Sequence, residues 1–497
     1  MKKLVTLILA LGVFSACQED FNEETAAPSS SSTIASTARL YENDKPDEHM
    51  AIVLGKKMIN PYTVQNMQAA FNYYNSVVPN SPFTGKTVQA THLYIKIMPN
   101  AMAQLEMLDK LDQSDDERSP VLQDYPMDYE VLEEGDYYAY PANENDLFHP
   151  AYTVIPVGYA FPSTVPYIVL DQIYEPAEEE FDVETVALYF AGCTEDLEAD
   201  EISVTDETLP DYLIKELADR QSLRLSLWPK RYRPSGWVKV QNTETNIMDP
   251  LMQVKISIGR NVFWRYTYTD NNGYFSAPKK YRGKVRIRAK WRGYTATIRK
   301  TWNEILGLWV SDHLMTITRG NNNITKNIMH GEPHTGIFGI DLQGGHLWFK
   351  GTVHNGLRKY IDFCNSNGIS HTVGNANVWA FAKGKDASTP MLYKYPQLAS
   401  MSTLANVGQA NFWSVLTNVI SGVAINLVPA HLRPDQIFGG LNNKKVSYDT
   451  RANTIRIHQV VFHESGHYSH ASKAGSSYWA NVFASEISNH ISYSDSY

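Results

Sequence analysis

Two histidines stand four residues apart, at His463 and His467, and Glu464 is the one charged residue between Val460 and His467. On an α-helix, residues four apart share one face, so both imidazoles can reach a single metal ion. Glu464 projects about 100° away around the helix, where its carboxylate can take a proton from a water on that ion. With 15 histidines in 497 residues, chance gives this pattern about 0.02 times in the chain. The pattern predicts a zinc-binding helix, and the alternative is a helix with two buried polar histidines.

The segment Val461–His467 resembles the zinc-binding helix of the zincin metalloproteases, and in particular that of the gluzincins. The resemblance implies hydrolysis of peptide bonds in a protein or peptide substrate, with Zn2+ as the cofactor. It also implies that His463 and His467 are zinc ligands and that Glu464 is the catalytic base toward the zinc-bound water. On this interpretation the chain is a zinc metalloendopeptidase of the HExxH type.

Two further site residues are implied by the same resemblance. In gluzincins a glutamate about twenty residues downstream, on a second helix, is the third ligand. Glu486 stands 19 residues after His467. Those enzymes also have a tyrosine near the developing oxyanion, and Tyr478 stands at the matching position, 11 residues after His467. Because the sequence ends at Tyr497, 30 residues after His467, a ligand beyond Tyr497 stays open as the alternative to Glu486.

The first 17 residues are typical of an export signal. Lys2 and Lys3 precede an apolar stretch, residues 4–14, that is too short to span a membrane. The small residues directly before Cys17 resemble the lipobox of bacterial lipoproteins, which implies cleavage before Cys17 and a lipid on its sulfur. The acidic residues that follow resemble the surface-export signal of Bacteroidetes lipoproteins, and residues 18–48 are expected to be a flexible tether. We therefore expect an outer-membrane lipoprotein, periplasmic or cell-surface exposed; the alternative is an ordinary secretory signal.

About 450 residues follow the tether, which is more than a single domain normally holds. We expect a multidomain chain, with an α+β domain of unknown role at 49–230, a small all-β sandwich at 233–300 and an α+β zincin-like domain at 304–497. Periodicity predicts helices at 63–74, 101–111, 209–224, 346–365 and 412–420, and strands at 91–97, 152–155, 165–170, 378–381 and 436–439. We expect the strand at 436–439 to form a sheet edge that binds an extended substrate.

Residues 233–300 carry alternating β patterns around a predicted turn. Apolar and polar residues alternate in Gly236–Val240, Val254–Ile258 and Lys284–Lys290, and Asn271–Gly273 is a turn signal. The order of these segments resembles the transthyretin-like, carboxypeptidase-regulatory-like β-sandwich, a family that implies no catalysis. Within 284–290 the basic residues share one face, which predicts a face exposed to solvent.

Charge is distributed unevenly along the chain. Residues 215–300 hold 20 Lys and Arg against 5 Asp and Glu, whereas the rest of the chain holds 24 against 48. A segment this basic needs an acidic partner. We expect that partner in the acidic N-terminal half, for example at Glu178–Glu180 or 195–207, and an anionic glycan or lipopolysaccharide is the alternative. Nucleic acid is not an expected partner of an exported lipoprotein.

Two functions from different classes remain. The first is a lipid-anchored, exported zinc metallopeptidase, which the segment around Glu464 favours. The second is a catalytically inactive surface adhesin or glycan-binding lipoprotein, in which the α+β domain and the sandwich bind a ligand. The zinc content of the purified protein separates the two functions.

Overall fold

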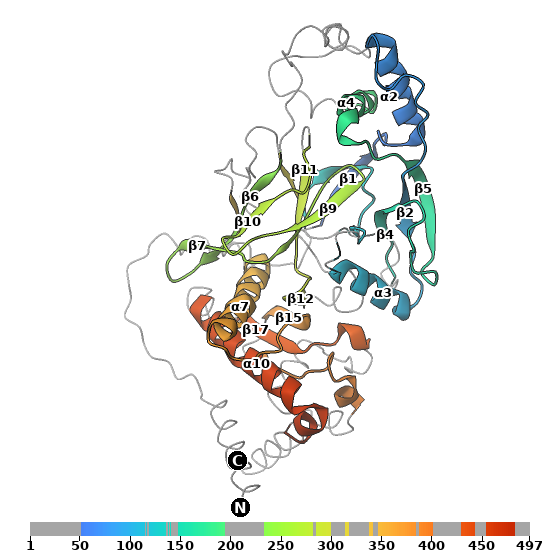
Figure 1. Ribbon diagram of the computed structural model, residues 1–497. Helices are drawn as coiled ribbons and strands as arrows, with labels where there is room; N and C mark the ends of the chain where they lie inside the picture. Colours follow the sequence, from blue (N-terminus) through green and yellow to red (C-terminus); the bar gives the residue numbers. More distant parts are fainter. Residues whose placement is uncertain are drawn as a thin grey trace, which may run out of the picture. The chain divides into compact units, whose positions relative to one another are not determined.

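In the computed structural model of the chain (Figure 1), the described residues are 51–193, 233–299, 314–317, 337–340, 346–400, 429–442 and 454–482, with gaps at 115, 117–118, 136–137, 139, 141–147, 282–284 and 384–386. These ranges contain both helices and several small, mostly antiparallel sheets, which confirms the predicted α+β character. Contacts group residues 46–497 into one compact unit, so a division into separate domains stays a prediction. Across the described ranges, no helix is both long and apolar enough to cross a membrane.

The N-terminal part of the described chain consists of small antiparallel sheets and helices. Its elements are β1 (Val53–Lys57), α2 (Val64–Val77), β2 (His92–Ile97), α3 (Met102–Gln113), β3 (Tyr129–Glu133), β4 (Ala151–Pro156), β5 (Tyr167–Ile173), η4 (Glu178–Glu180) and α4 (Phe181–Phe190). Strand β2 lies between β4 and β5, and β1 pairs with β3. The hydroxyl of Thr63 accepts a hydrogen bond from the Asn66 amide (3.2 Å) and caps α2. The helices and strands predicted between residues 63 and 170 are therefore confirmed.

The middle of the chain forms two four-stranded sheets. Their strands are β6 (Ser235–Asn242), β7 (Ile247–Pro250), β8 (Lys255–Arg260), β9 (Phe263–Tyr268), β10 (Tyr274–Ser276), β11 (Val285–Lys290), β13 (Leu314–Ile317) and β14 (Ile337–Ile340). One sheet has the order β10-β6-β14, with β7 also paired to β6, and the other has the order β13-β11-β8-β9. The predicted turn is present: Asp270 accepts hydrogen bonds from the amides of Asn272 and Tyr274 (both 2.8 Å). Both sheets also take a strand from beyond residue 300.

The basic strand β11 is buried on both faces. Arg288 and Lys290 are only 2% and 3% exposed, and the alternating apolar residues Val285, Ile287 and Ala289 are buried as well. The expectation that its basic side chains face solvent is wrong for Arg288 and Lys290, because the acidic end of α3 and the residues after it cover them, while Arg286 is half-buried and Lys284 lies outside the described residues. Arg288 pairs with Asp124 (2.6 Å) and Lys290 with Asp112 (3.1 Å). The predicted internal acidic partner is thus confirmed, although these partners lie in other segments than the two named in advance.

The C-terminal part contains a third four-stranded sheet. Its elements are β12 (Ala296–Arg299), α7 (His346–Ser366), β15 (Ala376–Lys383), β16 (Ala387–Ser388), η6 (Pro396–Ser400), η8 (Ala430–Leu432), β17 (Gln436–Asn442) and α10 (Thr454–Ala474). The sheet has the order β12-β15-β17-β16; the first three strands are parallel and β16 is antiparallel. The strand predicted at 436–439 is present within β17. Its predicted place at the sheet edge is wrong, because Ala387 of β16 pairs with Phe438.

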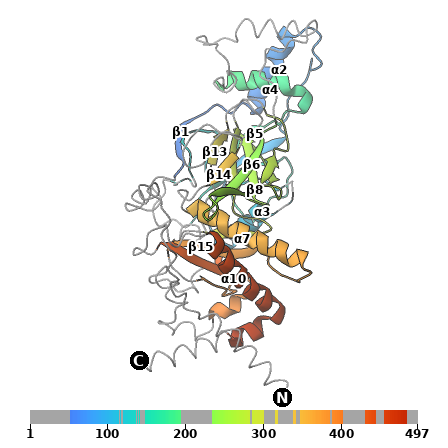
Figure 2. The same cartoon turned by 90° about the vertical axis from the view of Figure 1, so that its left-hand side faces the viewer.

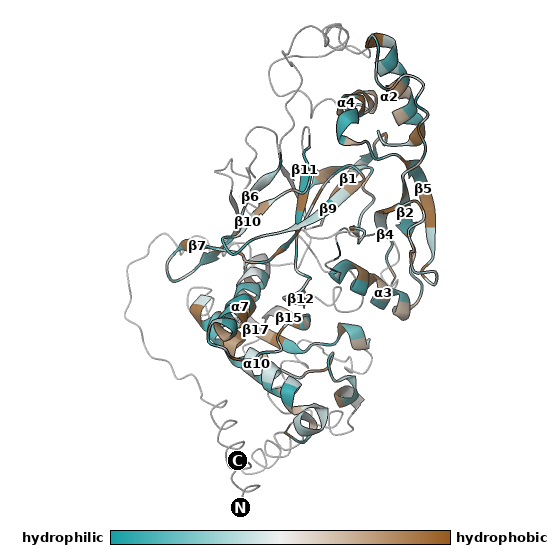
Figure 3. Cartoon of the chain, in the orientation of Figure 1, coloured by the Kyte–Doolittle hydropathy of each residue, from teal (hydrophilic) through white to brown (hydrophobic). Residues whose placement is uncertain are grey.

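Helices α7 and α10 pack against each other next to this sheet (Figure 2). The predicted helix at 346–365 coincides with α7. Helix α10 is coloured mostly pale and teal in Figure 3, since it has few strongly hydrophobic side chains. Its buried residues include the polar Glu464, Ser465 and Ser469. Part of its contact with the rest of the protein is therefore polar. The helices predicted at 209–224 and 412–420 lie outside the described residues.

Candidate metal centre

The helix α10 carries both histidines of the predicted zinc site, and its first turn is hydrogen-bonded to the residues that directly follow the distant strand β6. The Thr454 amide donates to the hydroxyl of Thr243 (2.9 Å), and the Thr243 amide donates to the hydroxyl of Thr454 (3.1 Å). The Ile455 amide donates to the carboxylate of Glu244 (3.1 Å). These contacts satisfy amides that the first turn of a helix cannot pair internally. The predicted helix is confirmed, and its start is fixed by tertiary contacts.

Close packing against α7 fixes one side of α10. A Cβ atom added at Gly356 would lie 3.0 Å from the Val461 side chain, so the two helices approach closely at this glycine. One turn further, the ring of Phe462 meets the Tyr360 ring edge-on, with centroids 5.5 Å apart. The Tyr360 hydroxyl donates to the hydroxyl of Ser469 (3.2 Å). Contacts on both sides of His463 and His467 therefore set the rotation of α10 about its axis.

The two histidines face each other as predicted. Their Nε2 atoms lie 3.0 Å apart, and the ring centroids are separated by 4.6 Å. Burial lowers the pKa of His463, while burial together with the neighbouring His463 and His470 lowers the pKa of His467 to about 4. Both rings are therefore neutral near pH 7, and a neutral imidazole is the form that binds a metal ion.

The spacing of this pair fits two ligands of one zinc ion. Two nitrogen ligands of a tetrahedral zinc ion, each about 2.0–2.1 Å from the metal, lie about 3.3 Å apart. The observed separation of 3.0 Å needs to widen by only a few tenths of an ångström. The same separation also fits a hydrogen bond between two neutral imidazoles, in which one ring donates its N–H to the other. Geometry and protonation thus permit a metal site, and metal binding distinguishes it from a simple histidine pair.

The side chain of Glu464 points to the sheet side of α10 and is only 7% exposed. The hydroxyl of Thr389, which directly follows β16, lies 2.6 Å from Glu464 Oε2 and 2.9 Å from the Glu464 carbonyl oxygen. Beside it, the side-chain amide of Gln436 donates to the hydroxyl of Ser465 (3.4 Å). Sequence reasoning missed Thr389, because it stands 75 residues before Glu464 and no local pattern marks it. Only the sheet brings the two residues together.

The other predicted site residues have different outcomes. Tyr478 packs on the ring of His470, with centroids 5.4 Å apart, and the neighbouring Trp479 lies 6.2 Å from the ring of His467. No sequence pattern singled out Trp479, which is buried and lies next to the candidate ligand His467. Glu486 and Cys17 lie outside the described residues. Among the side chains that the structure does describe, no group of three or more His, Cys, Asp or Glu residues could hold a metal ion.

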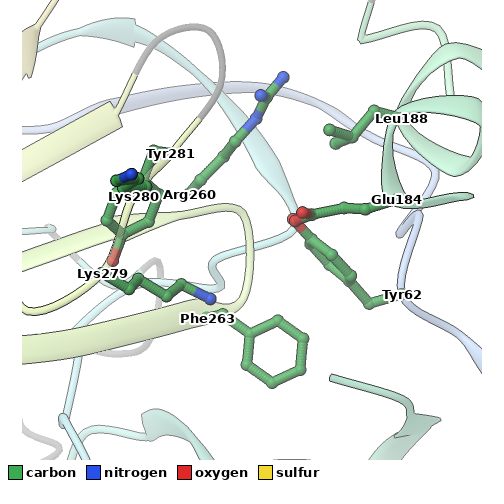
Figure 4. A pocket seen from close by; sticks show the side chains of 8 residues that line it. All are labelled: Tyr62, Glu184, Leu188, Arg260, Phe263, Lys279, Lys280 and Tyr281. Atoms are coloured by element: carbon green, nitrogen blue, oxygen red, sulfur yellow. The ribbon is translucent and has the colours of Figure 1, made fainter. Parts of the chain in front are cut away.

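A small pocket lies away from α10, between α4 and the strands β8 and β9 (Figure 4). The Tyr62 hydroxyl donates to Glu184 (2.7 Å) on one side of it. Cationic side chains line the other side, namely Arg260, Lys279 and Lys280. The pocket therefore combines three positive charges with one carboxylate that already accepts a hydrogen bond.

Comparisons with known proteins do not assign the chain to a family. No protein-family model matches it, and no curated protein matches it. Among solved structures, 38% of the chain is similar to 30% of a 9R-lipoxygenase from Cyanothece PCC8801, with 11% sequence identity and a TM-score of 0.12. So low a TM-score carries no argument about fold or function. The function has to be inferred from the site itself.

Proposed function

We propose that the protein is a lipid-anchored, exported zinc metallopeptidase. The observation that carries this proposal is the pair of neutral imidazoles of His463 and His467, with Nε2 atoms 3.0 Å apart on successive turns of one helix. Glu464 adds a buried carboxylate that follows the first ligand directly and is held by a hydrogen bond at 2.6 Å. Two imidazoles and a nearby base that does not bind the metal are the donor set of hydrolytic zinc sites.

In the proposed mechanism His463 and His467 would hold the metal, with Glu486, or a residue beyond Tyr497, as the third ligand. When bound, zinc lowers the pKa of its water to about 7 and polarises the scissile carbonyl. Glu464 would act as general base toward the attacking water and then as proton donor to the leaving amine. Tyr478 remains a proposed donor to the oxyanion.

A peptide substrate is proposed to pair with the antiparallel strand β16, which lies at the end of the third sheet. An extended peptide that joins a sheet edge gains main-chain hydrogen bonds whatever its sequence. Because Thr389 follows β16 directly and its hydroxyl contacts Glu464, a peptide on this edge would lie close to the proposed base. This role replaces the edge role that the sequence assigned to residues 436–439.

Metal analysis of the purified, full-length protein tests this proposal. We expect about one zinc per chain, since two imidazoles and a carboxylate suit zinc in a site with an open position. Glu464→Gln should retain zinc and lower peptidase activity by about 10²–10⁴-fold, because the general base is lost while both histidine ligands remain. His467→Ala should lose both zinc and activity. Glu486→Ala should weaken zinc binding only if Glu486 is the third ligand.

A metal-free wild-type protein that folds normally with both histidines intact would overturn the enzyme proposal. Zinc loss in Glu464→Gln would instead make Glu464 a ligand and remove it as the base.

If the enzyme proposal fails, the second candidate function is binding of an anionic glycan, which the cationic lining of the pocket, Arg260, Lys279 and Lys280, would support. In that case binding of heparin to the full-length protein should weaken as salt is raised, and should weaken in Lys280→Gln.

The proposed location rests on the segment that ends at Cys17. Replacing Cys17 by Ser removes the sulfur that would carry the lipid, so the variant should leave the membrane fraction and appear in the soluble fraction. Membrane fractionation and mass spectrometry of the N-terminal peptide measure the two effects. A Cys17→Ser protein that still carries lipid and still sediments with outer membranes would exclude lipidation at this cysteine.

A further inference from the structure

The contact between Thr389 and Glu464 joins a loop next to a sheet edge to the proposed general base. The Thr389 hydroxyl lies 2.6 Å from Glu464 Oε2 and 2.9 Å from the carbonyl oxygen of the same residue. Thr389 is 5% exposed and Glu464 is 7% exposed. A hydroxyl has a single proton, so it donates to one of these two acceptors at a time. The shorter distance is typical of an O–H group that donates to a carboxylate.

The backbone on both sides of Thr389 is held independently of Glu464. Just before it, Ala387 and Ser388 of β16 pair with β17. Just after it, the Met391 amide donates to the Asp435 carbonyl (3.2 Å) and the Leu392 amide to the Pro434 carbonyl (2.9 Å). The hydroxyl is therefore brought to Glu464 by the sheet, and removing it should leave the path of the chain unchanged.

A second set of contacts holds the following segment on α10. The Tyr395 hydroxyl donates to the Ala471 carbonyl (3.1 Å), and the ammonium of Lys394 lies over the ring of Tyr468, 5.3 Å from its centre. Both contacts are on the side of α10 that carries Glu464. The loop after β16 and the helix therefore form one fixed frame around the carboxylate.

We propose that Thr389 is a positioning residue for Glu464, an inference that rests on the proposed peptidase function. A glutamate side chain has three rotatable bonds, and a general base acts only where its oxygen can reach the proton it removes. The Thr389 hydroxyl holds Oε2 in one place, which limits the directions in which Oε1 can point. Thr389 itself touches neither the metal nor the bond that is broken, so it acts through Glu464.

Two substitutions of Thr389 separate the hydroxyl from the shape of the side chain. Thr389→Val keeps the branched shape and removes the donor, whereas Thr389→Ser keeps the donor. We expect Thr389→Val to retain zinc and to lower kcat by about 10–100-fold with KM little changed, because a misplaced base loses rate and not binding. Thr389→Ser should recover kcat to within about threefold of wild type. In Glu464→Gln, adding Thr389→Val should lower the residual rate no further, because no base is left to position.

A readout without activity tests the contact itself. In the zinc-free protein, the infrared difference between wild type and Glu464→Gln isolates the carboxylate band of Glu464. This band should shift in Thr389→Val, which removes its hydrogen bond, and return in Thr389→Ser. An unshifted band in Thr389→Val would overturn the proposal whether or not the protein is an enzyme.

The kinetic outcomes distinguish this inference from the function on which it rests. An active, zinc-loaded wild type whose Thr389→Val variant is equally fast would overturn the role of Thr389 alone. The same holds if Thr389→Ser is as slow as Thr389→Val, or if Thr389→Val raises KM with kcat unchanged. A wild type that has neither zinc nor peptidase activity would overturn the proposed function and the positioning role together.

Discussion

Two polar regions of the protein, one fully buried and one partly exposed, are built in opposite ways. At the end of α3, the fully buried Asp112 lies among Lys255, Lys290 and Arg292, and its carboxylate pairs with both Lys290 and Arg292. Burial by itself raises the pKa of Asp112, but the charges of Arg292, Lys290 and Lys255 outweigh it and hold that pKa well below its usual range. On α10, by contrast, two bases meet each other, with the Nε2 atoms of His463 and His467 3.0 Å apart.

The two regions differ in what compensates their polar groups. Opposite charges at Asp112 compensate one another within the fold, so this cluster has a structural role and includes three of the 20 Lys and Arg residues of the basic segment. Two neutral imidazoles provide lone pairs for which a cation is the natural partner. We therefore expect substitutions in the Asp112 cluster to affect mainly the stability of the fold. Substitutions at the histidine pair, which a metal ion would complete, should affect mainly activity.

The largest expected effect on stability comes from Asp112→Asn. The substitution keeps the size of the side chain but leaves Lys255, Lys290 and Arg292 without their buried counter-charge. We expect a loss of about 3–5 kcal/mol in the free energy of unfolding, measured by urea denaturation. Zinc content per folded chain should stay at the wild-type value, because the cluster does not contribute to the proposed metal site.

The matched control on the same helix is Glu106→Gln. Glu106 pairs with Lys110 one turn away at 2.7 Å, but both side chains are exposed. Removing this pair should cost less than about 0.5 kcal/mol. If Asp112→Asn were no more destabilising than Glu106→Gln, the buried cluster would have no structural role and the comparison would fail.

A smaller effect is expected where α7 packs on α10, and there added volume matters instead of charge. Gly356→Ala places a methyl group 3.0 Å from Val461, whereas Gly351→Ala on the same helix meets its nearest neighbour at 3.4 Å. Both changes gain helix propensity, up to about 1 kcal/mol. Overpacking should leave Gly356→Ala about 1–3 kcal/mol less stable than Gly351→Ala.

Peptidase activity provides a second measurement for the comparison of Gly356→Ala with Gly351→Ala. Because Val461 is two residues before His463, a shift of α10 moves the histidine pair, so Gly356→Ala should also lower peptidase activity. Gly351→Ala, farther from α10, should not. Equal stabilities and equal activities for the two variants would show that α7 does not set the position of α10.

Local sequence patterns were sufficient to predict helices and strands, but not which other elements pack against them. The spacing of His463 and His467 was sufficient to predict a helix with both rings on one face, and alternation was sufficient to predict β11. Alternation cannot tell which element covers a strand, so the burial of Arg288 and Lys290 by acidic residues near α3 was not foreseen. The same limit applies to β17, whose neighbour β16 is only two residues long and has no periodic signal.

The residues of the candidate site also differ in whether a local sequence pattern could identify them. The residues within one helix, His463, Glu464 and His467, could be identified because their spacing is local. Thr389 could not, since its distance from Glu464 depends on how β16 pairs with β17. Tyr478 matches a family position by spacing alone, and in the structure it packs on His470.

The hydrogen bonds that join Thr454 to Thr243 also constrain the order in which the protein can be assembled. These two residues are 211 positions apart, so the bonds cannot form until the chain has been synthesised to residue 454. A fragment that starts after Glu244 would have to begin α10 without the acceptors on Thr243 and Glu244, and an uncapped helix start lowers helix stability. Any peptidase activity of this chain should therefore arise late in folding. Cutting the chain between β6 and α10 should lower that activity even with every residue around His463 intact.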